Sequence, residues 1–385
     1  MDRTLPENEG AEKSNGGLRF LQMTFGFQTY IVSTFRHKLS MESTAAKRIP
    51  SLDGLRAMSI LLVIVGHFYQ SFMALAIFGV HIFFVISGYL ITKLLQDEYD
   101  RRGRIALGSF YRRRAFRIFP AAYAYIIIIA LLAPVSRPGL PYAATYTVSY
   151  HFVTTPLKFQ HLWSLSVEEQ FYLLWPLALV FGYRCRARIA CLAMLAASLF
   201  RFALAFCPSP CSMFYMHFSF PGSMDSIAAG CLLAIYEPQF RARLGWLSDA
   251  TAVAIALPLT AWTLERLWWG YTSIVSVRIM SAFWGLVPLL IGLWLFVLIP
   301  RRDRIFNNPV ASAIGVLSYS LYLWQQPFTF EQEYPKALAL LLLTACATAS
   351  YFFVEEPMLR LGALLNSRKS VPAPGSADVQ LQVTE

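Results

Sequence analysis

An arginine and a histidine stand 11 positions apart in one apolar stretch, at Arg56 and His67. On an α-helix this spacing ends about 20° beyond three full turns, so both side chains share one face, roughly 16 Å apart along the axis. An imidazole accepts a proton near neutral pH, and a guanidinium binds phosphate oxygens as a planar fork. The pair predicts a base and an anion-binding group at two levels of one helix. Taken singly, Arg56 could anchor the end of an apolar helix, and His67 could be a hydrogen-bonded histidine between helices.

Carboxylates recur at a similar depth in later apolar stretches. Glu168 and Glu169 lie seven or eight residues into the stretch that begins near His161, and Asp225 lies inside another. Two adjacent carboxylates cannot both face hydrocarbon, so at least one must turn toward a partner or water within the protein. A carboxylate beside an imidazole fixes its tautomer and stabilises the imidazolium. We therefore expect Glu169 or Glu168 to orient His67, with a structural ion pair elsewhere in the bundle as the alternative.

A cluster of arginines marks the start of a further apolar stretch. Arg114 and Arg117 are spaced to share one helical face, where two guanidinium forks suit phosphate oxygens. The alternative is plain anchoring of the helix on the cytoplasmic side. Together with Arg56 and His67, the cluster suggests a cytosolic donor with a phosphorylated head and a long thin arm that reaches inward. Coenzyme A has that form.

The composition places these residues in lipid. Of 385 residues, 56% are hydrophobic and only 14% are charged, whereas soluble domains carry about 25% charged residues. The net charge of +11 resides largely at the ends of apolar stretches, without the basic and aromatic groove pattern of a nucleic-acid binder. We therefore predict an all-α, polytopic membrane protein and no nucleic-acid partner. About ten stretches approach the ~20 apolar residues that cross a bilayer, at residues 55–75, 77–96, 115–134, 161–182, 187–206, 217–236, 246–264, 278–299, 309–330 and 337–359.

The distribution of lysine and arginine predicts the orientation. These residues follow the second, fourth, sixth and eighth stretches, and the alternate loops are poor in them. Because Lys and Arg accumulate on cytoplasmic loops, both termini are expected in the cytoplasm. We divide the chain into a cytoplasmic N-terminal segment (1–48), disordered or lying on the membrane surface, a membrane domain (49–360) and a disordered cytoplasmic tail (361–385). Met41 is an alternative start.

Seven sequence blocks resemble acyltransferase family 3, the membrane acyltransferases that modify lipopolysaccharide, capsule, peptidoglycan and other glycans. The resemblance covers about residues 49–360, and HLWSLSVEEQFYLLWP is its most specific block. The blocks occur in the order expected for the family: IPSLDGLRAMSILLVIVGHF, GVHIFFVISGYLI, FYRRRAFRIFPAAY, HLWSLSVEEQFYLLWP, SMDSIAAG, SYSLYLWQQP and FFVEEP.

The resemblance implies roles for these residues. His67 matches the family's catalytic histidine, and Arg56 its companion at the acyl-donor site. Arg114 and Arg117 match a basic motif linked to the donor. The acidic block contains Glu168 and Glu169, and the last block contains Glu356. Two positions depart from the pattern, His81 where many relatives have Asp and Gln325 where relatives often have His.

The expected activity is transfer of an acyl group, with acetyl favoured, from acyl-CoA to a carbohydrate hydroxyl at a bacterial inner membrane. His67 would act as general base. Ser164 is a candidate donor to the tetrahedral oxyanion, beside Ser166, Ser87 or a backbone amide. Acetyl-CoA enters as co-substrate, the acceptor is a carbohydrate or glycolipid, and no permanently bound cofactor or metal is expected. Direct transfer and an acyl-histidine intermediate both remain open, and the alternative functions are a proton-coupled transporter or a glycan flippase.

Overall fold

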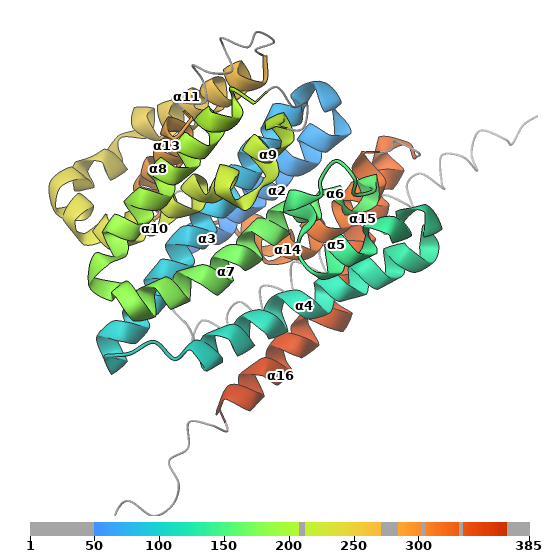
Figure 1. Cartoon of the computed structure of the whole chain (residues 1–385), viewed down its shortest axis with the longest axis horizontal. Coiled ribbons are helices and arrows are strands. Elements are labelled where there is room, and N and C mark those ends of the chain that lie inside the picture. Colours follow the sequence, from blue (N-terminus) through green and yellow to red (C-terminus); the bar gives the residue numbers. More distant parts are fainter. Residues whose placement is uncertain (1–49, 208–211, 271–283, 302–304, 331–333, 368–385) are drawn as a thin grey trace, which may run out of the picture.

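The computed structural model is a bundle of helices (Figure 1). It describes residues 50–207, 212–270, 284–301, 305–330 and 334–367. No strand occurs within these ranges, so the all-α prediction is confirmed for the part of the chain that they cover. The expected N-terminal segment, residues 1–48, lies outside them. The last described helix, α16 (Glu356–Ser367), extends into the expected tail, and the rest of that tail is not covered.

The first two helices of the described residues are separated by a turn that hydropathy does not reveal. Helix α2 (Pro50–Phe68) is followed by a 3-10 turn (Gln70–Phe72) and by α3 (Met73–Arg102). The expected first span, 55–75, therefore runs through the turn, because Phe72 and Met73 are as apolar as a helix interior. Helix α3 ends at Gly103, whose φ of 65° is a left-handed conformation that glycine adopts without a steric penalty.

The basic cluster lies on a helix and does not precede one. Helix α4 (Leu107–Leu132) begins well before the expected residue 115, so Arg114 and Arg117 belong to its first three turns. The next helices, α7 (Leu162–Gly182) and α8 (Arg186–Leu204), agree closely with the expected spans. The other long helices are α10 (Phe220–Leu244), α11 (Thr251–Gly270), α13 (Leu286–Leu298), α14 (Pro309–Thr329) and α15 (Lys336–Ser350).

Six helical stretches of the described residues are long and apolar enough to cross a membrane. One of them, Leu157–Leu204, contains two of the expected spans, and α13 is apolar but shorter. Helix α14 does not qualify, because it carries polar residues such as Ser320 and Gln325, both fully buried. A helix surrounded by other helices can hold such residues, since its polar groups find partners inside the protein. The structure thus supports a multi-pass membrane protein.

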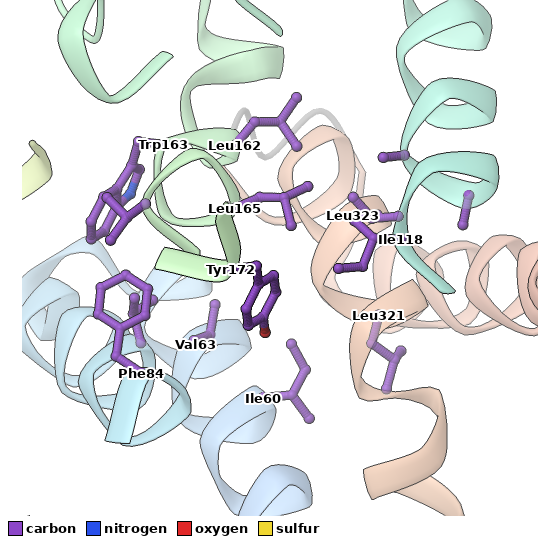
Figure 2. Close-up of a cluster of buried hydrophobic side chains, with 14 of the residues drawn as sticks. Ile60, Val63, Phe84, Ile118, Leu162, Trp163, Leu165, Tyr172, Leu321 and Leu323 are labelled. Carbon is purple, nitrogen blue, oxygen red and sulfur yellow. The ribbon is translucent and has the colours of Figure 1, made fainter. Parts of the chain in front are cut away.

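Helix α2 lies near the middle of the bundle (Figure 1), where it packs against α3 and α14. Its residues contribute to two apolar clusters. One cluster joins it to α3, α4, α7 and α14, whose side chains converge in Figure 2. The other joins it to α3, α10 and α13. The two side chains predicted on α2, Arg56 and His67, are therefore held by a helix that is packed from several sides.

Small residues set the spacing between α3 and α10. A Cβ atom at Gly88 would overlap the carbonyl oxygen of Ile227, and one at Gly230 would overlap that of Val85. The glycines of the two helices thus lie against each other's backbone. Such close approach is a usual way for helices to associate in lipid, where apolar surface alone supplies no driving force between them.

Replacing Gly88 with alanine should lower the stability of the protein by about 1–3 kcal/mol, because α3 and α10 must move apart to admit the methyl group. A thermal melt of the purified protein in detergent measures the effect. Gly108→Ala is the matched control, since Gly108 lies on α4 with no atom within 4 Å of its added Cβ. Equal melting temperatures for both variants would contradict close packing at this crossing.

Candidate active site

Two adjoining pockets follow one another along α2. The first, called here the basic pocket, is lined by Arg56 near the start of this helix. The second, called the histidine pocket, is lined by His67 near its end. Val80 and Tyr322 line both, so the pockets meet at these two side chains. The cavity volume is about 340 Å³ in the histidine pocket and about 90 Å³ in the basic pocket.

The basic pocket brings together six of the residues predicted from the sequence. They come from four helices: α2, α3, α4 and α7. Its apolar walls come from side chains of α3, α4, α7 and α14. The six residues are Arg56, Ser87, Arg114, Arg117, Ser164 and Glu168.

The guanidinium groups of α4 in this pocket are not neutralised by a carboxylate. Among the ion pairs of the described residues, Arg56 lies 3.9 Å from Asp53 and Arg113 lies 3.7 Å from Glu98, but no pair includes Arg114 or Arg117. The Nε atom of Arg114 is buried without a hydrogen-bond partner, and its guanidinium lies 5.8 Å and 5.9 Å from the ring centroids of Phe110 and Tyr172. A largely buried cation without a partner is costly. The site is therefore suited to an anionic ligand.

Glu168 is held by hydroxyl groups on the wall of the basic pocket. Ser87 donates to Oε1 at 2.8 Å, and Tyr172 donates to Oε2 at 3.4 Å. Ser87 and Tyr172 both line the pocket as well. The carboxylate thus has a fixed position near the guanidinium groups, without a direct ion pair to any of them in the described residues.

The histidine pocket is lined mainly by aromatic and aliphatic side chains. Its volume falls within the range of about 300–1,000 Å³ that small-molecule sites occupy. The Phe330 ring at its edge lies 6.0 Å from the ring of His67. Its polar lining residues are His67, Gln160, His161, His217, Tyr322 and Gln326.

A main-chain carbonyl fixes the tautomer of His67. The Nδ1 atom lies 2.8 Å from the carbonyl oxygen of Val63, one turn earlier on α2. A carbonyl oxygen only accepts hydrogen bonds, so Nδ1 carries the proton and Nε2 of the neutral ring has a free lone pair. The ring is thereby prepared to take a proton. No hydrogen bond joins His67 to Glu168 or Glu169 in the described residues, so the orientation expected from a carboxylate comes from the backbone.

Two other predicted carboxylates lie away from the pockets. Glu169 lines neither one, and its Oε1 atom is buried without a hydrogen-bond partner. Glu356 lies at the start of α16, where it pairs with Arg360 at 2.5 Å. Its neighbour Glu355 accepts a hydrogen bond from Ser320 of α14.

Asp225 belongs to a separate buried cluster. It forms an ion pair of 2.7 Å with Arg201 of α8, and both side chains are 0% exposed. Arg201 also donates to the carbonyl of Gly222. The structural ion pair considered as the alternative for the buried carboxylates is present here. On the same helix, α10, the Oγ of Ser226 lies 2.7 Å from Nδ1 of His81. His81 is one of the two positions expected to depart from the family pattern.

Sequence reasoning missed several residues of these sites. Arg201 lies inside an expected span, 187–206. An ionisable residue inside a span is a candidate for a structural or functional role, and the same reasoning that selected His67 would have selected Arg201. The side chains that join the pockets or hold Glu168 have common polar types in apolar surroundings, and their positions depend on helix packing. These are His161, Tyr172 and Tyr322, whereas Ser87 was expected as a possible oxyanion donor and not as the partner of Glu168.

Comparison with known proteins agrees with this architecture. The sequence model of the acyltransferase domain of acyltransferase family 3 matches residues 49–330, so the chain belongs to this family. It is 29% identical over 366 residues to the O-acetyltransferase OatA of Staphylococcus aureus strain MRSA252, covering 84% of this chain and 60% of that protein. For OatA of strain NCTC 8325 / PS 47 the identity is 29% over 354 residues, covering 82% and 58%. The chain thus spans about 60% of the length of these relatives. No solved structure matches.

Removing one partner of the buried ion pair between Arg201 and Asp225 should strongly lower the stability of the protein. Arg201→Ala leaves Asp225 charged, buried and unpaired, which costs about 3–5 kcal/mol. The double variant Arg201→Met with Asp225→Leu should recover much of that loss, because no charge then remains buried. Thermal melts in detergent compare the three proteins.

Arg360→Ala is the control for this experiment. The Arg360 side chain is 73% exposed, and an exposed pair is worth about 0–1 kcal/mol, so its melting temperature should stay near that of the parent. A double variant no more stable than Arg201→Ala would argue against the charge itself as the cause.

Proposed function

We propose that this protein transfers an acyl group, acetyl in the first instance, from acyl-CoA to a hydroxyl of a carbohydrate such as a surface or exported polysaccharide. The observation that carries the proposal is the meeting of the two pockets. A basic pocket with unneutralised guanidinium groups adjoins a larger pocket that contains a histidine with a free lone pair. The relatives named as O-acetyltransferases support acetyl as the group and oxygen as its acceptor.

The donor would lie in the basic pocket and beyond its opening. Phosphate oxygens of the CoA head would bind Arg114 and Arg117, since guanidinium forks match phosphate geometry. Arg56 lines the same pocket from α2 and would face the arm of the donor. The thioester at the end of that arm would reach the junction at Tyr322, where the basic pocket meets the histidine pocket.

The acceptor hydroxyl would enter the histidine pocket. Nε2 of His67 takes its proton while the oxygen attacks the thioester carbonyl. When the tetrahedral intermediate collapses, the C–S bond breaks, and the imidazolium returns the proton to the leaving thiolate. The reaction therefore needs no further proton source. This route is direct transfer, and an acyl group carried on His67 would use the same lone pair.

The membrane arrangement that fits this function has ten spans, with both termini in the cytoplasm of a bacterial cell and the chain in the inner membrane. The basic pocket would then open toward the cytosol, where acyl-CoA is made. The base would lie beyond the midplane, which favours an acceptor on the outer side. Residues 1–48 would form the cytoplasmic N-terminal segment, and the tail would follow the membrane domain on the same side.

Replacing His67 with alanine should reduce acyl transfer by at least 10²-fold, as expected for loss of a general base. The assay incubates inner-membrane vesicles with radiolabelled acetyl-CoA and measures label in the glycan fraction. His151→Ala is the matched control, because His151 is exposed and lines neither pocket. Normal transfer by a well-folded His67→Ala variant would refute the assignment, and a wild-type protein that labels nothing would refute the function.

Replacing Arg114 with alanine should raise the KM for acetyl-CoA roughly tenfold to hundredfold, because a hydrogen bond to a charged group contributes about 1.5–3 kcal/mol. The turnover number should change less. Arg101→Ala serves as control, since Arg101 is exposed at the end of α3 and bonds only to the Asp97 carbonyl among the described contacts. An unchanged KM for Arg114→Ala would remove this residue from the donor site.

A further inference from the structure

Tyr322 is the polar residue at the boundary of the two pockets. It extends from α14 and lines both cavities, and the only other residue to do so among the described ones is the aliphatic Val80. Under the proposed function, on which this inference rests, the reacting thioester must lie where donor and acceptor meet. A hydrogen-bond donor at that place would face the carbonyl oxygen as it becomes an oxyanion.

The hydroxyl of Tyr322 has one proton, which it donates to a backbone carbonyl. Tyr322 donates to the carbonyl oxygen of His161 at 2.7 Å. The Oγ of Ser164 lies 2.5 Å from the phenolic oxygen, and since the phenolic proton points to the carbonyl, Ser164 is the donor in this contact. Tyr322 therefore accepts a hydrogen bond from Ser164 and donates its own proton to the backbone carbonyl of His161.

That backbone group would remain satisfied if Tyr322 turned away. The backbone N–H of Ser164 already donates to the His161 carbonyl, at an N–O distance of 3.4 Å. Ser164 Oγ lies 3.5 Å from the same carbonyl oxygen and can turn its proton to it once Tyr322 leaves. Breaking a buried hydrogen bond is expensive chiefly when a partner is left unpaired. Here no group is orphaned, so the phenol can exchange partners at low cost.

The ring of Tyr322 lies where the two cavities meet, and it is partly exposed to them. It packs against two neighbouring rings at ordinary aromatic distances, 6.4 Å from the centroid of Phe83 and 5.7 Å from that of His161. A swing of this ring would join the two cavities and free the phenolic proton together.

We propose that Tyr322 is a catalytic residue that leaves the His161 carbonyl when the thioester arrives and donates its hydrogen bond to the oxyanion of the tetrahedral intermediate. The phenol keeps its proton throughout. The acceptor C–O bond forms, the C–S bond breaks, and the hydroxyl proton moves by way of His67 to the thiolate. Ser164 is then a positioning residue, which takes the place of Tyr322 on the carbonyl. This revises the expectation that Ser164 itself contacts the oxyanion.

The test compares Tyr322→Phe with Tyr125→Phe. Tyr125 is a buried phenol of α4 that also donates to a backbone carbonyl, that of Lys158, and it lines neither pocket. Both variants lose one phenol-to-carbonyl hydrogen bond and keep the ring. Inner-membrane vesicles with radiolabelled acetyl-CoA give kcat and KM for the donor, and thermal melts in detergent give stability.

We expect Tyr322→Phe to lower kcat by about 10²–10³-fold, the usual effect of losing one oxyanion donor, with the KM for acetyl-CoA within about threefold of the wild type. Tyr125→Phe should keep kcat within about twofold. Ser164→Ala should fall between them, because the phenol remains. A Tyr322→Phe protein that turns over normally overturns the inference and leaves the function standing.

Two further results would also overturn the inference. A kcat loss in Tyr322→Phe matched by Tyr125→Phe, with an equal drop in melting temperature, would show a structural effect only. A loss seen in Ser164→Ala but not in Tyr322→Phe would assign the oxyanion contact to the serine. A wild-type protein without transfer in the same assay would refute the function, and the role of Tyr322 with it.

Discussion

The rest of the candidate site depends on the packing of α2 between α3 and α14. This single helix carries Arg56 at one pocket and His67 at the next, so the distance between the two groups is set by helix geometry and not by loops. A rigid element of this kind holds reacting groups to a fraction of an ångström, which flexible connections do not achieve. The glycine contacts between α3 and α10 serve the same purpose, because they fix the position of α3, against which α2 packs.

His67, the proposed base, differs from the usual design of a catalytic histidine in what orients its ring. In water-accessible sites a carboxylate commonly orients the ring, but a carboxylate held in hydrocarbon requires partners of its own. Here the carbonyl of Val63 performs the orientation without adding a charge. Glu168 is then free to lie in the basic pocket, held by Ser87 and Tyr172. From this position the Glu168 carboxylate weakens the positive potential of the arginines without forming an ion pair with any of them in the described residues.

Much of this architecture could be predicted from the sequence, and the reasons for the failures are physical. Apolar stretches fixed the existence of the helices, since lipid requires about 20 apolar residues in each span. Hydropathy could not locate the turn at residues 70–72, because apolar residues continue across it and hydropathy does not report where the chain reverses direction. The helical spacing of Arg56 and His67 predicted two levels, and the structure has a pocket at each. Ser87 as a partner of Glu168 and Arg201 as the partner of Asp225 could not be predicted, because they come from other helices whose rotations only packing decides.

The buried charges of this protein fall into two groups that differ in how completely they are satisfied. Arg201 and Asp225 neutralise each other: both side chains are fully buried, they lie 2.7 Å apart, and the guanidinium also bonds to the Gly222 carbonyl. This ion pair joins α8 to α10 and leaves no net charge between them. Arg114 and Arg117 have no carboxylate partner in the described ranges, although each of the two systems has one arginine with a buried, unbonded Nε, Arg114 and Arg201.

The cost of burying a guanidinium without a carboxylate partner is several kcal/mol, and the rings of Phe110 and Tyr172 near Arg114 offset only part of it. That cost is offset once an anion binds, because the hydrogen bonds missing in the free protein are then made. A site that is incomplete alone and complete with its ligand also binds more selectively, since a neutral molecule leaves the same groups unpaired. The difference between the two arginine systems is therefore the carboxylate partner, which Arg201 has and which Arg114 and Arg117 lack in the described ranges. It is this difference, and not the number of charges, that makes the basic pocket suited to an anionic ligand, as the proposed function requires.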